Sequence, residues 1–177
     1  MPVTFISSKE QGLSLIESAM VLSLAATITA GVMFYYQSTS DSNKTLKTIE
    51  EVMTVTSAIN GLYTGQKDYK NLSSLTLLGL SAIPDTYKSG YDILNPFGGR
   101  LEVTSYNSNA NYKIKLTNLP KQACIRLATQ NLGTAAKGYA INPMNGSSEE
   151  RDMAPKISPD EASKQCGDIN SVTFFMK

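Results

Sequence analysis

A single carboxylate, Glu17, stands near the start of a long apolar stretch of the sequence. From Leu13 to Tyr36 there are 24 residues with no proline and no other charged side chain. An ionised acid is costly in the middle of a membrane, and less so where a helix end lets it approach the interface. In the first turn of a helix, the acid also complements the helix dipole and can pair with an amino group four residues back. That explanation is adequate for a protein anchored as a monomer.

Two cysteines, Cys124 and Cys166, are the other reactive side chains, and they lie 42 residues apart. Outside the cytoplasm the default expectation for such a pair is a disulfide. The chain-entropy model gives roughly 4 kcal/mol for a loop of this length, which is comparable to much of the net stability of a small domain. The alternative is two unrelated buried thiols in a reducing compartment. Neither cysteine belongs to a CxxC or zinc-ligand spacing.

Catalysis and metal binding have little support in the sequence. The chain has no histidine, the commonest general base and metal ligand. Glu149, Glu150 and Asp152 form an acidic cluster, but Arg151 lies among them in the polar segment 142–156, and a solvated loop is the simpler interpretation. No phosphate-binding glycine motif, calcium loop or nucleophile elbow is present. We therefore expect no enzyme and no cofactor or metal. The formal net charge of +1 also gives no reason to expect a nucleic-acid partner.

The apolar stretch is long enough to be a membrane-spanning helix. As an α-helix it extends about 36 Å, more than the hydrocarbon core of a bilayer. Beyond it, apolar side chains recur at spacings of three and four, which predicts that the helix continues with one apolar face. These side chains are Leu46, Ile49, Val52, Met53, Ile59, Leu62 and Tyr63. We therefore expect one helix over 13–65, apolar all round in its first half, amphipathic in its second, and ending at Gly65.

The remaining residues predict one small domain. Residues 66–99 are rich in turn signals. Two alternating segments predict half-exposed antiparallel strands, and two more are strand candidates: 101–105, 112–116, 137–142 and 172–176. Two short helices are also expected. One, over 120–132, would place Cys124 towards the core, and the other, after a capping box at Ser158, would carry Cys166.

The segment before the apolar run does not fit an ordinary secretory signal. The apolar core is too long, no small-residue cleavage site follows it, and an acid stands near its front. The polar cluster that begins at Ser7 ends at Gly12, so a cut between Gly12 and Leu13 would preserve the hydrophobic segment. The mature chain would then begin at Leu13, with Glu17 as its fifth residue.

The stretch GLSLIES, from Gly12 to Ser18, resembles the processing site of type IV prepilins: a glycine, an apolar first residue and a glutamate at the fifth mature position. Nearly the whole chain is similar to type IVb pilins, in GLSLIESAMVL, AGVMFYYQS, SAINGLY, NPFGG, LGTAAKGYAIN and VTFFMK. Its 12-residue leader is short for that class. No proline interrupts the helix, whereas many type IVa pilins have prolines there, so we expect a less kinked helix.

The resemblance implies the ladle fold of type IV pilins. This is an α+β fold, in which a long N-terminal helix packs on an antiparallel sheet that carries one disulfide, here Cys124–Cys166. The implied divisions are a leader that is removed, 1–12, and a long helix, 13–65, whose first part, 13–36, is transmembrane and later filament core. The head follows over 66–177. It includes an αβ loop, 66–99, and a disulfide-bounded region, 124–166.

The resemblance also implies roles for individual residues. A prepilin peptidase would cut between Gly12 and Leu13 and N-methylate Leu13. In a filament, Glu17 would pair with the new amino terminus at Leu13 of a neighbouring subunit. An unpaired charge in an apolar surround is expensive, so this pair would penalise wrong registers more than it strengthens right ones.

The implied function is that of the major structural subunit of a type IVb pilus. The prepilin would lie in the inner membrane of a Gram-negative cell. Inner-membrane assembly machinery would extract it into an extracellular homopolymer that serves bacterial aggregation and adherence to host cells. Three alternatives remain open: a minor pilin or secretion-system pseudopilin, a conjugative thin-pilus pilin, and a membrane-anchored periplasmic domain. A minor pilin or pseudopilin would be scarce in sheared fibres, and a conjugative pilin would have transfer genes beside its own gene. A membrane-anchored domain would retain Met1.

Overall fold

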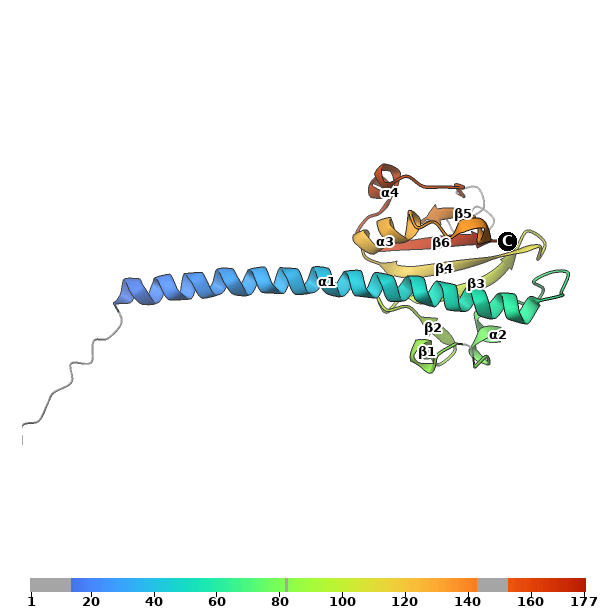
Figure 1. Cartoon of the computed structure of the whole chain (residues 1–177), viewed down its shortest axis with the longest axis horizontal. Helices are drawn as coiled ribbons and strands as arrows, with labels where there is room; N and C mark the ends of the chain where they lie inside the picture. The colour runs from blue at the N-terminus through green and yellow to red at the C-terminus, as the bar shows by residue number, and fades with distance from the viewer. Residues whose placement is uncertain (1–13, 82, 143–152) are drawn as a thin grey trace, which may run out of the picture. The chain divides into compact units, whose positions relative to one another are not determined.

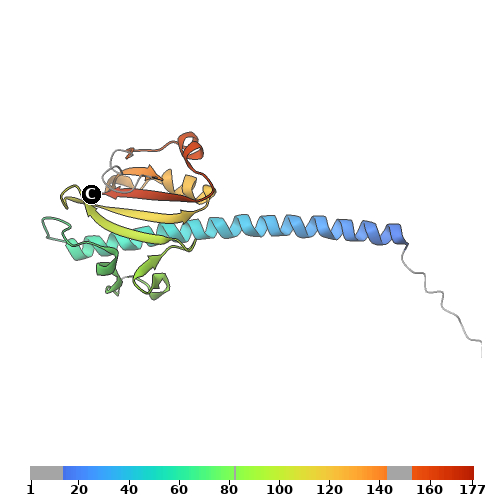
Figure 2. The same ribbon diagram turned by 180° about the vertical axis from the view of Figure 1, so that it is seen from behind.

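The computed structural model describes residues 14–81, 83–142 and 153–177. The chain divides into two compact units, Met1–Ser40, of which residues 14–40 are described, and Asp41–Lys177. Figure 1 labels the helices and strands, and Figure 2 shows them from behind. The described residues form an α+β structure with a long helix and a six-stranded antiparallel sheet, which confirms the predicted fold class.

Helix α1, Leu15–Tyr63, contributes to both units. Its 49 residues contain no proline, so no backbone donor is missing along its length. The helix ends two residues before Gly65, whose φ of 82° lies in the left-handed region that glycine adopts without a Cβ penalty. The backbone N–H of Gln66 donates to the carbonyl of Tyr63 at 3.0 Å. Gly65 therefore acts as the predicted stop.

The sheet has the strand order β1-β2-β3-β4-β6-β5, with every pair antiparallel. The strands are β1 Lys88–Ser89, β2 Asp92–Leu94, β3 Arg100–Tyr106, β4 Asn111–Leu119, β5 Ala136–Ile141 and β6 Asn170–Met176. Strands β3 and β4 form a hairpin whose turn holds Asn107, Ser108 and Asn109 at positive φ. Strand β6 lies between β4 and β5 (Figure 1), so the four predicted strand segments all belong to one sheet.

The shorter elements complete the Asp41–Lys177 unit. They are α2 Ser74–Leu78, the 3-10 turns η1 Asp85–Tyr87 and η2 Gly133–Ala135, α3 Lys121–Ala128 and α4 Pro159–Gln165. Helix α4 begins as its capping box predicts, because the Ser158 hydroxyl accepts from the Glu161 N–H at 3.3 Å. Helix α3 ends at Ala128, four residues earlier than expected, and the hydroxyl of its C-cap residue, Thr129, donates to the carbonyl of Ile125 at 2.8 Å.

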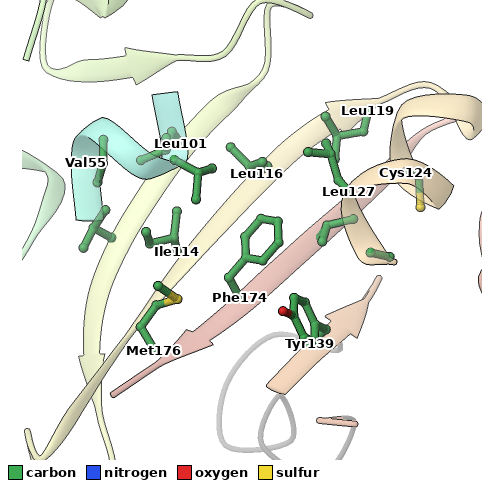
Figure 3. Packing of buried hydrophobic residues seen from close by; sticks show 14 of the residues in the cluster. Val55, Leu101, Ile114, Leu116, Leu119, Cys124, Leu127, Tyr139, Phe174 and Met176 are labelled. Atoms are coloured by element: carbon green, nitrogen blue, oxygen red, sulfur yellow. The ribbon is translucent and has the colours of Figure 1, made fainter. Parts of the chain in front are cut away.

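The core lies between the sheet and the second half of α1. Figure 3 shows Val55 of α1 beside Leu101 of β3, with Ile114, Leu116 and Phe174 from the central strands around them. Those apolar side chains are all buried, as alternation predicts for β3 and β4. Strand β6 departs from alternation, because six of its seven residues are buried in the middle of the sheet. A central strand covered on both faces is apolar on both.

The predicted apolar face of α1 is partly wrong. Val52 and Ile59 are buried as expected, but Leu46, Met53 and Leu62 are 63%, 52% and 41% exposed. The inward positions belong instead to Thr45, Thr48, Glu51, Val52, Val55 and Ile59. Spacings of three and four in a segment this rich in apolar residues fit two adjacent stripes equally well. The packing against the sheet selects one stripe and leaves the other on the surface.

Candidate assembly site

The first part of α1 presents an apolar surface on every side. None of residues 14–39 is buried, and Phe34, Tyr35 and Tyr36 are 79%, 73% and 76% exposed. An 18-residue window of α1 has a mean hydropathy of 1.7, and by length and composition this helix is able to cross a membrane. Soluble monomers do not keep contiguous apolar surface of this extent in water. The segment therefore needs a lipid or protein partner.

Three of the hydroxyls on this segment are satisfied inside the helix. Thr27 and Thr29 donate to the carbonyls of Ser23 and Ala25 at 2.9 and 2.8 Å, and Ser18 donates to the carbonyl of Ser14 at 3.2 Å. A hydroxyl bonded to the carbonyl four residues earlier needs no outside partner. The same surface is therefore compatible with hydrocarbon and with the side of another helix.

Glu17 lies in the first turn of α1 and is exposed. Its carboxylate makes no ion pair with another residue in the described part of the chain. At this end of the helix, free N–H groups favour a negative charge, and an amine from outside the chain has access to it. Gly12 and Leu13 lie outside the described residues, so cleavage there and N-methylation of Leu13 stay predictions.

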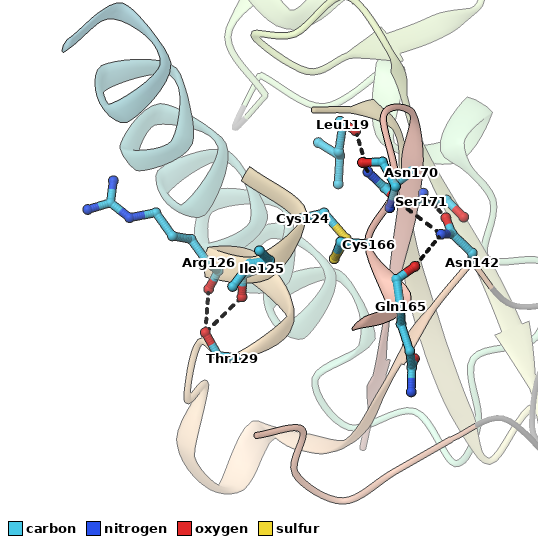
Figure 4. The surroundings of a disulfide bond; sticks show 11 residues. Leu119, Cys124, Ile125, Arg126, Thr129, Asn142, Gln165, Cys166, Asn170 and Ser171 are labelled. Atoms are coloured by element: carbon cyan, nitrogen blue, oxygen red, sulfur yellow. Dashed lines mark hydrogen bonds between the residues drawn. A yellow bond between two sulfur atoms is a disulfide. The ribbon is translucent and has the colours of Figure 1, made fainter. Parts of the chain in front are cut away.

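The disulfide joins Cys124 of α3 to Cys166, the C-cap of α4, with the two Cα atoms 6.1 Å apart (Figure 4). Both cysteines are buried, and no free cysteine remains. Helix α4 has only seven residues, too few to be stable alone. The disulfide thus fixes a short helix to the sheet-bound helix α3 and closes the predicted disulfide-bounded region.

Two asparagines beside the disulfide escaped sequence reasoning. The Asn170 side-chain amide donates to the carbonyls of Leu119 and Gly167 at 3.0 and 2.9 Å. Asn142, at a φ of 47°, donates from its amide to the Asn170 side-chain oxygen at 3.0 Å and accepts from the Ser171 N–H at 2.6 Å (Figure 4). These bonds join the ends of β4, β5 and α4 to the start of β6. Only the enrichment of asparagine at positive φ offered a signal.

A buried acid, Glu51, was also missed. It is 0% exposed on the inward face of α1, and neither carboxylate oxygen has a hydrogen-bond partner among the residues that the structure describes. Burial removes water from the charged form and raises the pKa of Glu51 to about 8. The carboxyl is therefore mainly neutral at pH 7. An acid between apolar positions of an amphipathic helix gives no sign in the sequence of which way it faces.

The stretch NPFGG is a turn, as predicted, and Asn95 organises it. The buried Asn95 side-chain oxygen accepts from the N–H groups of Phe97 and Gly99 at 2.9 and 3.2 Å. Its amide donates to the carbonyl of Thr117 on β4 at 2.9 Å. Gly98 has a φ of 78°. The turn thus carries a tertiary contact between β2, β3 and β4.

The described residues contain no cluster of side chains that could hold a metal ion. No group of three or more His, Cys, Asp or Glu side chains comes together there. The acidic cluster Glu149, Glu150 and Asp152 lies outside the described residues. Two of the strand tyrosines are core residues: Tyr112 is 1% exposed with a pKa raised by burial to about 12, and Tyr139 is 5% exposed and accepts from the Leu132 N–H at 3.0 Å.

Known proteins resemble this chain over most of its length. The family model described as Bundlin matches residues 37–172. A protein named major structural subunit of bundle-forming pilus, from Escherichia coli O127:H6 (strain E2348/69 / EPEC), is 54% identical over 183 aligned positions. A protein with the same name from Escherichia coli O111:H- is also 54% identical. Each alignment covers 95% of this chain and 95% of the relative.

Proposed function

Because this chain belongs to the bundlin family of type IVb pilins, we propose that it is the major structural subunit of a bundle-forming type IV pilus. The observation that carries the proposal is 54% identity over 95% of both chains to subunits of that name. The structure supports it with an apolar helical segment that has no covering partner among the described residues. In a homopolymer, that segment is covered by copies of itself.

The proposed sequence of events begins in the inner membrane. A prepilin peptidase removes residues 1–12 by cleavage between Gly12 and Leu13 and methylates the new amino group. Residues 13–36 hold the protein in the membrane until the assembly machinery extracts it into the extracellular filament. The GLSLIES motif and the exposed apolar part of α1 support this order. Loss of lipid contacts is offset by helix contacts, since the surface suits both environments.

Glu17 sets the register between subunits in this proposal. Cleavage creates an amine at Leu13, and the exposed Glu17 carboxylate of a neighbouring subunit receives it. Both charges lie in an apolar surround once the filament has formed, where a pair is tolerated and an unpaired charge is strongly disfavoured. Incorrect registers are penalised by leaving the charges unpaired. The assembled filament then serves bacterial aggregation and adherence to host cells.

The test compares wild type with Glu17→Ala and with Glu102→Ala, a control that removes an exposed acid from β3. Fibres are sheared from cells, and their subunit is analysed by intact mass and N-terminal sequencing. We expect wild-type and Glu102→Ala fibres whose subunit begins at N-methylated Leu13. Glu17→Ala should be processed in the membrane but absent from the sheared fraction. A membrane-bound monomer that retains Met1 would overturn the proposal.

A further inference from the structure

The stripe of α1 that faces away from the sheet, from Leu46 to Leu62, forms the floor of a groove. Within the Asp41–Lys177 unit, the groove has a volume of about 850 Å³, room for several side chains at once. One wall is formed by Leu80 and Ser81, just after α2. The apolar side chains that line it include Leu46, Ile49, Met53, Leu62 and Leu80. These are the residues that the core left exposed or half-buried.

Part of the floor of the groove is built from small residues. Ser57, Ala58 and Gly61 are small residues that line it, and Ser57 and Gly61 are four residues apart on one side of α1. A Cβ built on Gly61 meets no atom within 4 Å, so the space outside it is open. Small residues at this spacing let the backbone of a second helix approach closely. Glu50 is the one charged residue among the described residues that line the groove.

We propose that this groove binds the apolar segment Leu15–Tyr36 of helix α1 from a second copy of the chain. The inference rests on the proposed function, because only a polymer supplies that segment from outside. The segment is exposed all round and has no charge after Glu17. It also has small residues four positions apart, Ala26 and Ala30, which match Ser57 and Gly61 on the floor.

The dimensions of the two surfaces agree. Residues 15–36 extend about 33 Å as a helix, and the floor from Leu46 to Leu62 extends about 25 Å. One segment therefore spans the floor and keeps a remainder for other contacts. The other large exposed apolar residues described outside α1 are Leu75, Tyr91 and Ile169, which stand singly in separate parts of the unit. They form no apolar ridge of similar length.

The first test is a photo-crosslink in sheared fibres. A benzophenone amino acid replaces Met53 in the groove, or Tyr91, an exposed control residue that does not line it. After irradiation, the covalent dimer is isolated on a denaturing gel and digested with trypsin. We expect position 53 to be joined to the peptide that ends at Lys44, which contains the apolar segment, and position 91 not to be. Dimers joined only to head peptides would overturn the groove.

The second test uses two leucines of equal exposure. Leu46 lines the groove and is 63% exposed, whereas Leu75 does not line it and is 61% exposed. Leu46→Gln should lower the yield of sheared fibres about tenfold or more, a factor that corresponds to ~1.4 kcal/mol, and Leu75→Gln should not. Processing and thermal unfolding of the membrane-bound subunit should match wild type in both variants.

The outcomes separate the groove from the proposed function. If wild type forms no fibres, the pilin function fails. If wild type forms fibres and Leu46→Gln does too, or if Leu46→Gln and Leu75→Gln lose them equally, the function stands and the groove is wrong.

Discussion

The side-chain amide of Asn170 donates to the backbone carbonyl of Leu119, 3.0 Å away and 51 residues earlier in the chain. The bond lies where the pairing of β4 with β6 shifts register, between Leu116 and Leu119. A register shift interrupts the regular ladder and leaves backbone groups without a strand partner. Asn170 supplies the missing donor from a side chain that is 3% exposed.

Asn170→Leu should therefore destabilise the Asp41–Lys177 unit. The leucine is branched at the same carbon as the asparagine but leaves the carbonyls of Leu119 and Gly167 without their donor, which costs about 1–3 kcal/mol. Urea unfolding of the full chain in detergent, followed by near-UV circular dichroism of the buried tyrosines, measures the change. Asn43→Leu, on an exposed turn of α1, is the matched control and should stay near wild type. Equal midpoints for the two variants would refute this role.

Removal of the disulfide should cost about 2–5 kcal/mol in the free energy of unfolding. The Cys124→Ser/Cys166→Ser double variant loses the covalent link between α3 and α4. The same unfolding assay, with and without dithiothreitol, measures the loss. Reductant should move the wild-type midpoint towards that of the double variant and leave the double variant unchanged. An unchanged wild-type midpoint after verified reduction would contradict the prediction.

Glu51 should make the protein less stable as pH rises. Its folded pKa, about 8, lies above the unfolded value, so between about pH 4.5 and pH 8 the folded state holds a proton that the unfolded state has released. Stability from this group is thus greatest below about pH 4.5, falls through that window and is flat above it. A shift of this size sets an upper limit of roughly 5 kcal/mol.

Glu51→Gln keeps the shape of the side chain and removes the titration. We expect the variant to lose this slope and to exceed wild type in stability above pH 8. Glu50→Gln, which changes the neighbouring exposed acid, should keep the slope. The measurement is the unfolding free energy of each variant at a series of pH values. Parallel curves for wild type and Glu51→Gln would show that Glu51 does not titrate in this window.

Gly99→Ala should strain the turn that Asn95 organises. A Cβ on buried Gly99 would collide with the backbone carbonyl of Thr117 on β4, which cannot move without disturbing the sheet. Overpacking of this kind costs about 1–3 kcal/mol or more. Gly61→Ala, in open space on a helix, is the control and should be neutral or stabilising by up to about 1 kcal/mol. Thermal unfolding of the two variants tests the difference.

Local signals explain why so much of the fold was predictable. The end of α1 at Gly65, the capping of α4 by Ser158 and the alternation in β3 and β4 each depend on neighbouring residues. Strands β1 and β2 have two and three residues, too few to show a period. The apolar face of α1 was misassigned because two stripes satisfied the same spacing, and only the sheet determines which one is buried.

The candidate site divides in the same way. The apolar segment and the motif around Glu17 are contiguous in sequence and were visible there. Glu51, Asn95 and Asn170 acquire their importance from partners or burial that the fold supplies. The Asn170 amide and its Leu119 acceptor lie on different strands, and no local pattern joins them. The groove was hidden for a related reason, since Leu80 reaches α1 from a segment predicted only as rich in turns.

The placement of β6 between β4 and β5 imposes an order of events during synthesis. Strand β5 ends at Ile141 and β6 ends at Met176, so β4 and β5 are made before the strand that both must pair with. At typical translation rates, the 35 residues that separate these two ends take roughly 2–7 seconds. Throughout that interval β4 has an open edge, the kind of edge that recruits strands from other chains. Newly made subunits thus pass through a brief period in which two heads can pair wrongly, before either is ready to join a filament.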